Sequence, residues 1–238
     1  MGQTTTDASF VGSLPAIYQQ YLVPLIFEPY AADLATRLSE RPLRRVLEIA
    51  AGTGAVTRRL AAALPESVAI VATDLNQGML DQAVAAGTPR PVEWRQADAM
   101  QLPFPDEAFD AVVCQFGAMF FPNRARGFAE ARRVLRPGGV FLGMLYARHS
   151  LVAYRKWFGN ALKAGQPWRS LSSVIWDHME SVGTKAYTER EVRQLFTGFS
   201  ACRTTKLLTP YDTEELPAWA NHVLPPALGW NIAIEATR

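Results

Sequence analysis

A turn made of small residues follows the first strongly apolar run of the sequence. Residues 46–54 are VLEIAAGTG, and a stretch rich in alanine and leucine, typical of a helix, begins near Ala55. Small side chains let a ligand touch the backbone, and the N–H groups at the start of a helix favour a carboxylate or a phosphate. The segment therefore predicts a strand, a ligand-binding turn and a helix, in that order.

A carboxylate stands beyond this turn at a spacing that suits a nucleoside. Asp74 follows a second apolar run, Val68 to Thr73, and a carboxylate in this place can accept hydrogen bonds from both ribose hydroxyls. NAD enzymes share both features, but their fingerprint has a third glycine where this chain has Thr57. An adenosine-type ligand at the carboxyl edge of a sheet is expected, and the turn alone does not choose the cofactor.

Two further segments of the sequence narrow the choice of cofactor. Residues 96–113 are QADAMQLPFPDEAFDAVV, and residues 133–139 are RVLRPGG. With the glycine turn and Asp74, in this order and spacing, they resemble the class I S-adenosylmethionine-dependent methyltransferases, most closely the branch of the ubiquinone and menaquinone C-methyltransferases. The resemblance covers roughly residues 44–145, and it implies S-adenosylmethionine as cofactor and S-adenosylhomocysteine as product.

The resemblance implies a set of cofactor-binding residues. The methionine part would lie against the glycine turn and the backbone after the fourth strand. The ribose would bind Asp74, and the adenine amino group would bind Asp98. N-terminal helices, which in the related enzymes fold over the cofactor, would offer two tyrosine hydroxyls. The expected set is Tyr18, Tyr21, Glu48, Ala50, Gly52, Thr53, Gly54, Asp74, Leu75, Met79, Asp98, Ala99, Met100, Gln115 and Phe116.

Alternatives remain open at this point. Asp74 and Asp98 could cap helices or turns, and Met79 and Met100 could simply fill the core. The chain could also be a non-catalytic protein that binds S-adenosylmethionine, because no single side chain performs methyl transfer. An NAD-dependent oxidoreductase is the remaining alternative.

Methyl transfer from a sulfonium needs in-line alignment more than acid or base help, so no catalytic triad is expected. A base would help only where the acceptor is a phenol or an acidic carbon. The catalytic residues stay undetermined, and the candidates for such a base are His149, His178 and Tyr146.

Aromatic residues gather in the segment after the fifth strand. They predict contact with a flat or apolar acceptor, or else a small core of their own. The candidates for acceptor binding are Trp157, Phe158, Trp168 and Trp176. We expect an O- or C-acceptor in a small organic molecule, because the Asn/Asp-Pro-Pro-aromatic motif, in which amide and adenine N-methyltransferases resemble one another, is replaced here by Gln115-Phe116-Gly117-Ala118.

Composition excludes several other partners. The 24 basic and 22 acidic residues give a net charge of +2 and no basic patch for nucleic acid. Cys114 and Cys202 lie in apolar runs, as buried thiols do, and no cluster of metal ligands is evident. No apolar run reaches the roughly 18 residues that span a bilayer. A cytoplasmic protein without membrane insertion is expected, and its oligomeric state stays open.

Short apolar runs alternate with helical stretches after residue 41. This alternation predicts an α/β fold in which a doubly wound, mostly parallel sheet is covered by helices on both faces. The resemblance implies the Rossmann-like, seven-stranded form of that sheet. The strands expected are residues 45–50, 68–73, 92–96, 111–115, 140–145, 202–208 and 231–236.

The clearest predicted helices are residues 53–64, 76–86, 123–135 and 189–196, and Gly138-Gly139 is expected to close the third of them. We predict one methyltransferase domain over residues 1–238. It would comprise an N-terminal helical cover (1–40), a cofactor-binding core (41–147), a helical lid insertion (148–188), and a last helix and strands (189–238).

Overall fold

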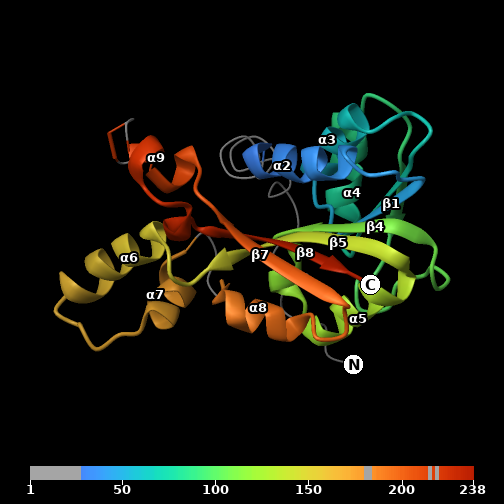
Figure 1. The fold of residues 1–238 in the computed structure, drawn as a ribbon. Helices are drawn as coiled ribbons and strands as arrows, with labels where there is room; N and C mark the ends of the chain where they lie inside the picture. The colour runs from blue at the N-terminus through green and yellow to red at the C-terminus, as the bar shows by residue number, and fades with distance from the viewer. Residues whose placement is uncertain (1–27, 180–183, 214–215, 218–219) are drawn as a thin grey trace. The chain divides into compact units, whose positions relative to one another are not determined.

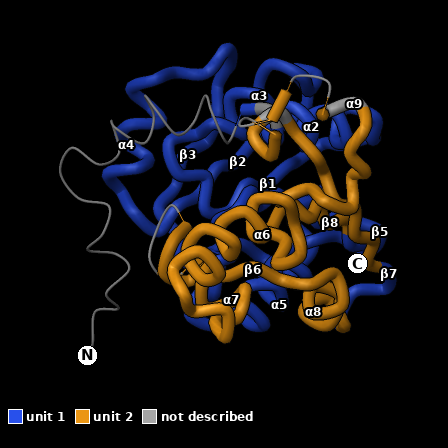
Figure 2. The backbone as a smooth tube through the Cα atoms, turned by 90° about the vertical axis from the view of Figure 1, so that its left-hand side faces the viewer, with its two compact units in different colours: residues 1–143, 198–201, 236–238 blue, residues 144–197, 202–235 orange. Residues whose placement is uncertain are grey.

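The computed structural model describes residues 28–179, 184–213, 216–217 and 220–238. Tyr18 and Tyr21, with most of the expected N-terminal cover, lie outside the described residues. The chain forms two compact units (Figure 2). One comprises the chain up to Gly143 with residues 198–201 and 236–238, and the other comprises residues 144–197 and 202–235.

Within the residues that the structure describes, eight strands form the sheet, and several of them are labelled in Figure 1. Strand order is β3-β2-β1-β4-β5 in the first unit and β5-β8-β7 in the second, where the short β6 pairs with β5. β1 is parallel to β2 and β4, and β2 is parallel to β3. The strands are β1 (Arg45–Ile49), β2 (Ala69–Asp74), β3 (Glu93–Gln96), β4 (Phe109–Gln115), β5 (Leu135–Ala147), β6 (Ala186–Tyr187), β7 (Ala201–Leu207) and β8 (Asn231–Thr237).

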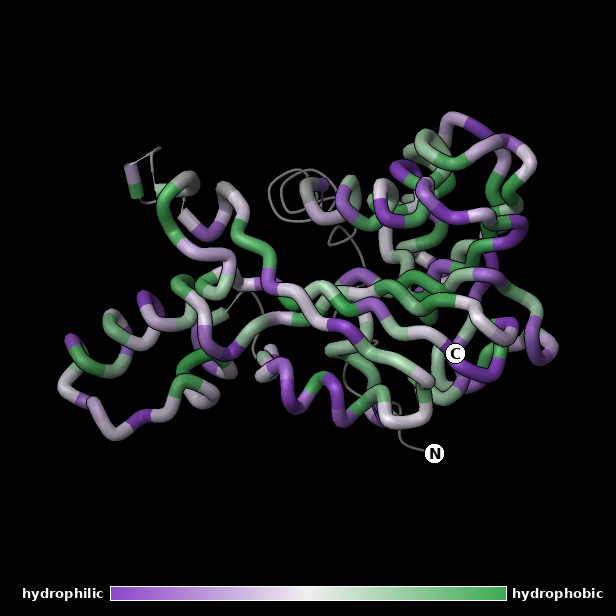
Figure 3. Tube along the Cα trace, in the orientation of Figure 1, coloured by the Kyte–Doolittle hydropathy of each residue, from purple (hydrophilic) through white to green (hydrophobic). Residues whose placement is uncertain are grey.

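This arrangement confirms the predicted α/β class and its seven strands, to which β6 adds a two-residue eighth. β1 and β4 are almost wholly buried, whereas the residues of the edge strand β3 are exposed or half-buried. The apolar runs that predicted these strands are visible as the hydrophobic stretches of β4 and β5 in Figure 3, and α8 is largely hydrophilic there.

Five of the α-helices, α4 to α8, begin at side-chain caps. Asn76, Asn123, Ser150, Ser170 and Thr188 each accept a hydrogen bond from a backbone N–H in the first turn of a helix. The α-helices are α2 (Glu28–Ser39), α3 (Ala55–Ala63), α4 (Gln77–Ala86), α5 (Arg124–Val134), α6 (Leu151–Trp157), α7 (Leu171–His178), α8 (Glu189–Leu195) and α9 (Ala220–Val223). The short helical turns are η3 (Gly117–Phe120), η4 (Phe158–Leu162), η5 (Pro210–Thr213) and η6 (Pro226–Leu228).

The segment around Gly138 differs from its prediction. The helix ends at Val134, and the RPGG residues belong to β5 rather than to a closing turn. Gly138 donates its N–H to the carbonyl of Arg238 at 3.1 Å, and Arg238 donates to the carbonyl of Gly139 at 2.9 Å. This backbone pairing with a segment remote in sequence, which local patterns do not contain, holds the two glycines in the sheet.

Candidate functional site

The glycine turn joins β1 to α3 through three residues in the left-handed region. Ala50, Gly52 and Gly54 have φ angles of 53°, 57° and 79°. Gly54 could not carry a side chain, because a Cβ there would lie 2.8 Å from the Trp94 ring. A Cβ at Gly52 would meet no atom of the described residues within 4 Å, so its backbone is accessible within this part of the chain. The turn therefore offers an accessible backbone beside the first turn of α3.

Glu48 is buried beneath this turn and is only 2% exposed. Its Oε2 accepts a hydrogen bond from the Thr57 hydroxyl at 2.5 Å. Burial raises the pKa of the Glu48 carboxyl to about 8, against the lowering effect of the bond from Thr57. Thr57 thus uses the position of the third fingerprint glycine to hold a buried carboxyl, which a dinucleotide-binding turn does not require.

Asp74 connects the ends of β1 and β2. Its Oδ2 accepts from the backbone N–H of Gly52 at 2.8 Å, and its Oδ1 accepts from that of Asn76 at 2.9 Å. The side chain that caps α4 is Asn76, which accepts from the Met79 N–H at 3.3 Å. Asp74 therefore orients the glycine turn and caps the turn at Asn76, one of the two roles left open from the sequence, whereas the cap of the helix itself is Asn76.

The residues expected around adenine divide into two groups. Leu75 is 46% exposed, whereas Met79 is 5% exposed, as a core residue would be. Asp98 accepts from the Met100 N–H through Oδ1 at 2.8 Å, and Oδ2 has no hydrogen-bond partner among the described residues. Ala99 is buried beside it. Asp98 thus caps a turn with one carboxylate oxygen. Its second oxygen could accept a hydrogen bond from an amino group.

The backbone after β4 is shaped by contacts that the sequence patterns did not predict. Phe116 has a φ of 58°, and the buried Tyr30 of α2 meets its ring edge-on with centroids 5.7 Å apart. A Cβ at Gly117 would lie only 2.3 Å from the Cβ of Ala50. Gln115, the last residue of β4, is buried. The glycine turn and the loop after β4 are therefore in direct contact.

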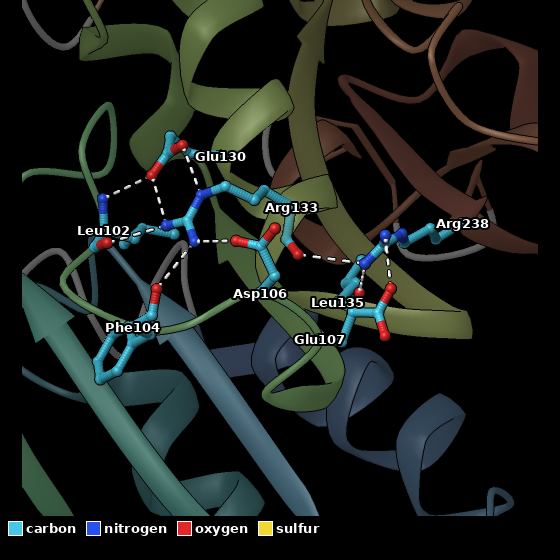
Figure 4. A network of polar contacts seen from close by, with 8 residues as sticks. All are labelled: Leu102, Phe104, Asp106, Glu107, Glu130, Arg133, Leu135 and Arg238. Carbon is cyan, nitrogen blue, oxygen red and sulfur yellow. Dashed lines mark hydrogen bonds and ion pairs between the residues drawn. The ribbon is translucent and has the colours of Figure 1, made fainter.

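The LPF and RPGG segments are held together by Arg133 (Figure 4). Its guanidinium donates to the carbonyl oxygens of Leu102 and Phe104 at 3.0 and 2.9 Å and pairs with Asp106 at 2.7 Å. Glu130 accepts from Arg133 at 2.8 Å, and this bond is the main cause of its lowered pKa. These motif residues act on the fold rather than on a ligand.

The neighbouring carboxylates are also held in ion pairs. Glu107 pairs with Arg238 at 2.9 Å, and Asp110 pairs with Arg136 at 2.7 Å. Backbone N–H groups at residues 44 and 45 and Arg136 lower the pKa of Asp110 despite its partial burial, which raises it. The run of three acids is therefore a structural turn and not an acid/base pair.

The aromatic candidates of the second unit have distinct surroundings. Trp157 is half-buried, and its Nε1 donates to the carbonyl of Arg169 at 2.6 Å. Phe158 is 48% exposed and faces Lys163, and Trp168 is 78% exposed. Trp176 lines a cavity of about 350 Å³.

The three candidate bases differ in environment. The ring Nδ1 of His149 lies 3.0 Å from the hydroxyl of the exposed Tyr154, and Nε2 of His178 lies 3.2 Å from the Arg169 guanidinium. Tyr146 is 5% exposed and stacks on Trp230 with centroids 4.6 Å apart. Tyr146 is thus a packed core side chain, whereas each histidine ring has a side chain to orient it.

The described residues lack two kinds of feature. They hold no group of three or more histidine, cysteine or acidic residues arranged to bind a metal ion. None of the helices in this part of the chain combines the length and the apolar character needed to cross a bilayer.

Comparison with known proteins identifies the family. Residues 47–143 match the family model described as a methyltransferase domain. The ubiquinone/menaquinone biosynthesis C-methyltransferase UbiE of Teredinibacter turnerae is 32% identical over 179 residues, 68% of this chain and 70% of that protein. The demethylmenaquinone methyltransferase of Deinococcus radiodurans is 42% identical over 110 residues, and the match covers 45% of each chain.

Solved structures show the same fold. A SAM-dependent methyltransferase from Thermotoga maritima is 20% identical with a TM-score of 0.63, over 94% of this chain and 96% of that one. An S-adenosylmethionine-dependent methyltransferase from Mesorhizobium loti is 19% identical with a TM-score of 0.61, over 87% of this chain and 98% of that one.

Fold and sequence together define a Rossmann-like methyltransferase. The chain belongs to the class I S-adenosylmethionine-dependent methyltransferases, in the branch of the UbiE C-methyltransferases. This confirms the resemblance drawn from the four motifs. S-adenosylmethionine is the cofactor that family and fold imply, and the accessible backbone at Gly52 and the second oxygen of Asp98 are compatible with polar contacts to it.

Proposed function

We propose that this methyltransferase transfers a methyl group to an oxygen or carbon atom of a small organic molecule. The observation that carries the proposal is the bond from the Gly52 N–H to Asp74, because it joins the glycine turn to the carboxylate at the ends of two adjacent parallel strands. Ligands of doubly wound sheets bind at such strand ends.

The cofactor would be held by the first unit. Its methionine part would lie along the glycine turn, from Ala50 through Thr53 to Gly54, with Glu48 beneath and the backbone of residues 115–116 opposite. Asp74 would accept from the ribose hydroxyls, and Asp98 from the adenine amino group. Leu75, Met79, Ala99 and Met100 would enclose the adenine ring, and the chemistry supplied when the cofactor is bound is an activated sulfonium methyl.

The protein's part in the reaction is alignment and exclusion of water. Holding an acceptor in line with a reactive carbon can supply about 7 to 11 kcal/mol of the barrier. No general base is required unless the acceptor is a phenol or an acidic carbon. For such acceptors His149 and His178 remain the candidates, since each ring is oriented by a second side chain.

Acceptor choice would reside outside the first unit's core. Residues 148–188 would form a lid whose aromatic side chains, Trp157, Phe158, Trp168 and Trp176, favour a flat or apolar acceptor. Residues 1–40 would cover the cofactor, with hydroxyls from Tyr18 and Tyr21. A small-molecule acceptor accords with the quinone-pathway names of the UbiE relatives.

The test is binding followed by turnover. Calorimetry should show that the full chain binds S-adenosylhomocysteine and not NAD, and a panel of phenols and enolisable ketones should yield S-adenosylhomocysteine from S-adenosylmethionine. Preference for NAD would contradict the cofactor assignment. Binding without turnover on any acceptor would instead support a non-catalytic binding protein.

Substitution of Asp74 tests the ribose contact. Asp74→Ala should weaken S-adenosylhomocysteine binding by about 1.5 to 3 kcal/mol, the range for a hydrogen bond to a charged group. Asp81→Ala, which removes an exposed carboxylate that accepts only from Gln77 within α4, is the matched control. An unchanged dissociation constant in folded Asp74→Ala protein would refute the assignment.

A further inference from the structure

A cavity of about 350 Å³ opens in the second unit between α7, β6 and α8. This volume lies at the lower end of the range of small-molecule sites, roughly 300 to 1,000 Å³. The residues that give it chemical character are Arg148, Trp176, Lys185, Glu191 and Gln194. Every one of them belongs to the second unit, so the cavity is a site within that unit.

One wall of the cavity is aromatic. The Trp176 side chain is 45% exposed, although a large apolar side chain is stabilised by burial. The ammonium of Lys185 lies 5.7 Å from the centroid of its ring. An accessible ring next to a cation suits a flat ligand that carries negative charge at one edge.

The acidic member of the lining is already fully engaged. Glu191 accepts from Arg148 at 2.9 Å and from the backbone N–H and hydroxyl of Thr188 at 2.7 and 2.9 Å. Although burial raises the pKa of Glu191, these bonds lower it below its ordinary value. A cationic ligand would therefore have to compete for a carboxylate that belongs to the capping box of α8.

The basic side chains of the lining differ, because Arg148 is paired with Glu191 and Lys185 is not in an ion pair with any described residue. Lys185 has no carboxylate partner within the described part of the chain. The Nε of Arg148 is buried and has no hydrogen-bond partner among the same residues, and an unpaired buried donor is costly. The charge balance of the cavity thus favours an anion.

We infer that this cavity binds a small planar carboxylic acid as its anion, with its ring against Trp176 and its carboxylate at Lys185. A carboxylate would supply the charged acceptor that Lys185 lacks, and a conjugated ring would cover the exposed indole. The inference concerns equilibrium binding and does not depend on the proposed methyl transfer.

Three small ligands separate the contribution of the aromatic ring to binding from that of the negative charge. Cinnamate has both features, cinnamamide keeps the ring without the charge, and hexanoate keeps the charge without the ring. Calorimetry on the full chain should show saturable, one-site binding of cinnamate, with each of the other two weaker by about tenfold or more. Equal affinity for all three, or no saturation with cinnamate, would overturn the inference.

Matched variants locate the binding. Lys185→Gln should abolish the preference for cinnamate over cinnamamide, Lys185→Arg should retain it, and Trp176→Leu should weaken cinnamate but not hexanoate. The controls are Lys163→Gln, which removes a lysine beside the Phe158 ring outside the cavity, and Trp168→Leu at an exposed indole. If the controls lose as much affinity as the cavity variants, binding lies elsewhere. If Trp176→Leu fails to fold, the comparison of Lys185→Gln with Lys185→Arg still tests whether the carboxylate binds at Lys185.

Discussion

At the scale of single residues, the buried carboxyl of Glu48 makes stability depend on pH. Its pKa is about 8 in the fold and 4.5 in an ordinary setting. Between these values the unfolded chain has lost a proton that the folded protein keeps, so the free energy of unfolding falls as pH rises, by at most about 1.4 kcal/mol per pH unit.

We therefore expect Glu48→Gln, which keeps a hydrogen-bonding group without the titration, to flatten the dependence. Urea unfolding from pH 5 to 8 should show the wild-type protein losing stability relative to Glu48→Gln. Glu66→Gln, at an exposed position, serves as control. Parallel curves for wild type and Glu48→Gln would mean that Glu48 is ionised in the fold.

Ala50 and Gly117 pack so closely that only one of the two positions can carry a methyl group. Gly117→Ala alone should destabilise the protein by about 1 to 3 kcal/mol, because its new methyl would overlap that of Ala50. The exchange Ala50→Gly with Gly117→Ala should restore stability, since the next contacts of that methyl are 3.3 and 3.5 Å away. Denaturant unfolding of the single and double variants measures this rescue. Additive losses would refute the contact.

At the scale of elements, Arg133 connects the LPF loop to α5. We expect Arg133→Lys to cost about 1 to 3 kcal/mol of unfolding free energy, because a lysine cannot reproduce the forked contacts to two carbonyls and two carboxylates. Arg59→Lys, at an exposed pair with Glu28, should cost less than about 1 kcal/mol. Urea titrations compare them, and equal losses would contradict this role.

The same elements show which parts of the fold sequence patterns can predict. Apolar runs predicted β1 and β4 because central parallel strands are buried on both faces, and the order of motifs predicted the Gly52 turn and Asp74 as neighbours. The two-residue β6, the strand course of Gly138 and the contact of Tyr30 with Phe116 were not predicted. Each depends on a partner distant in the chain, which local periodicity does not encode.

At the scale of the whole molecule, we expect the proposed N-terminal cover to contribute to methyl transfer but not to folding of the sheet. Removal of residues 1–22 should leave the sheet folded, because its strands begin at Arg45, yet slow methyl transfer by exposing the reacting carbon to water. Circular dichroism and S-adenosylhomocysteine release measure the two effects separately. Full activity in the truncated chain would remove the cover from the proposed mechanism.

The two units are interleaved along the chain, and this has a consequence for how the protein is made. Residues 236–238 belong to the first unit although the whole of the second unit's sequence precedes them, and Arg238 pairs there with Gly138, Gly139 and Glu107. Domains generally fold in order as the ribosome releases them. Here the nascent first unit lacks its last backbone partners until synthesis has passed through the second unit, so the first unit can be completed only after residues 144–235 have been made.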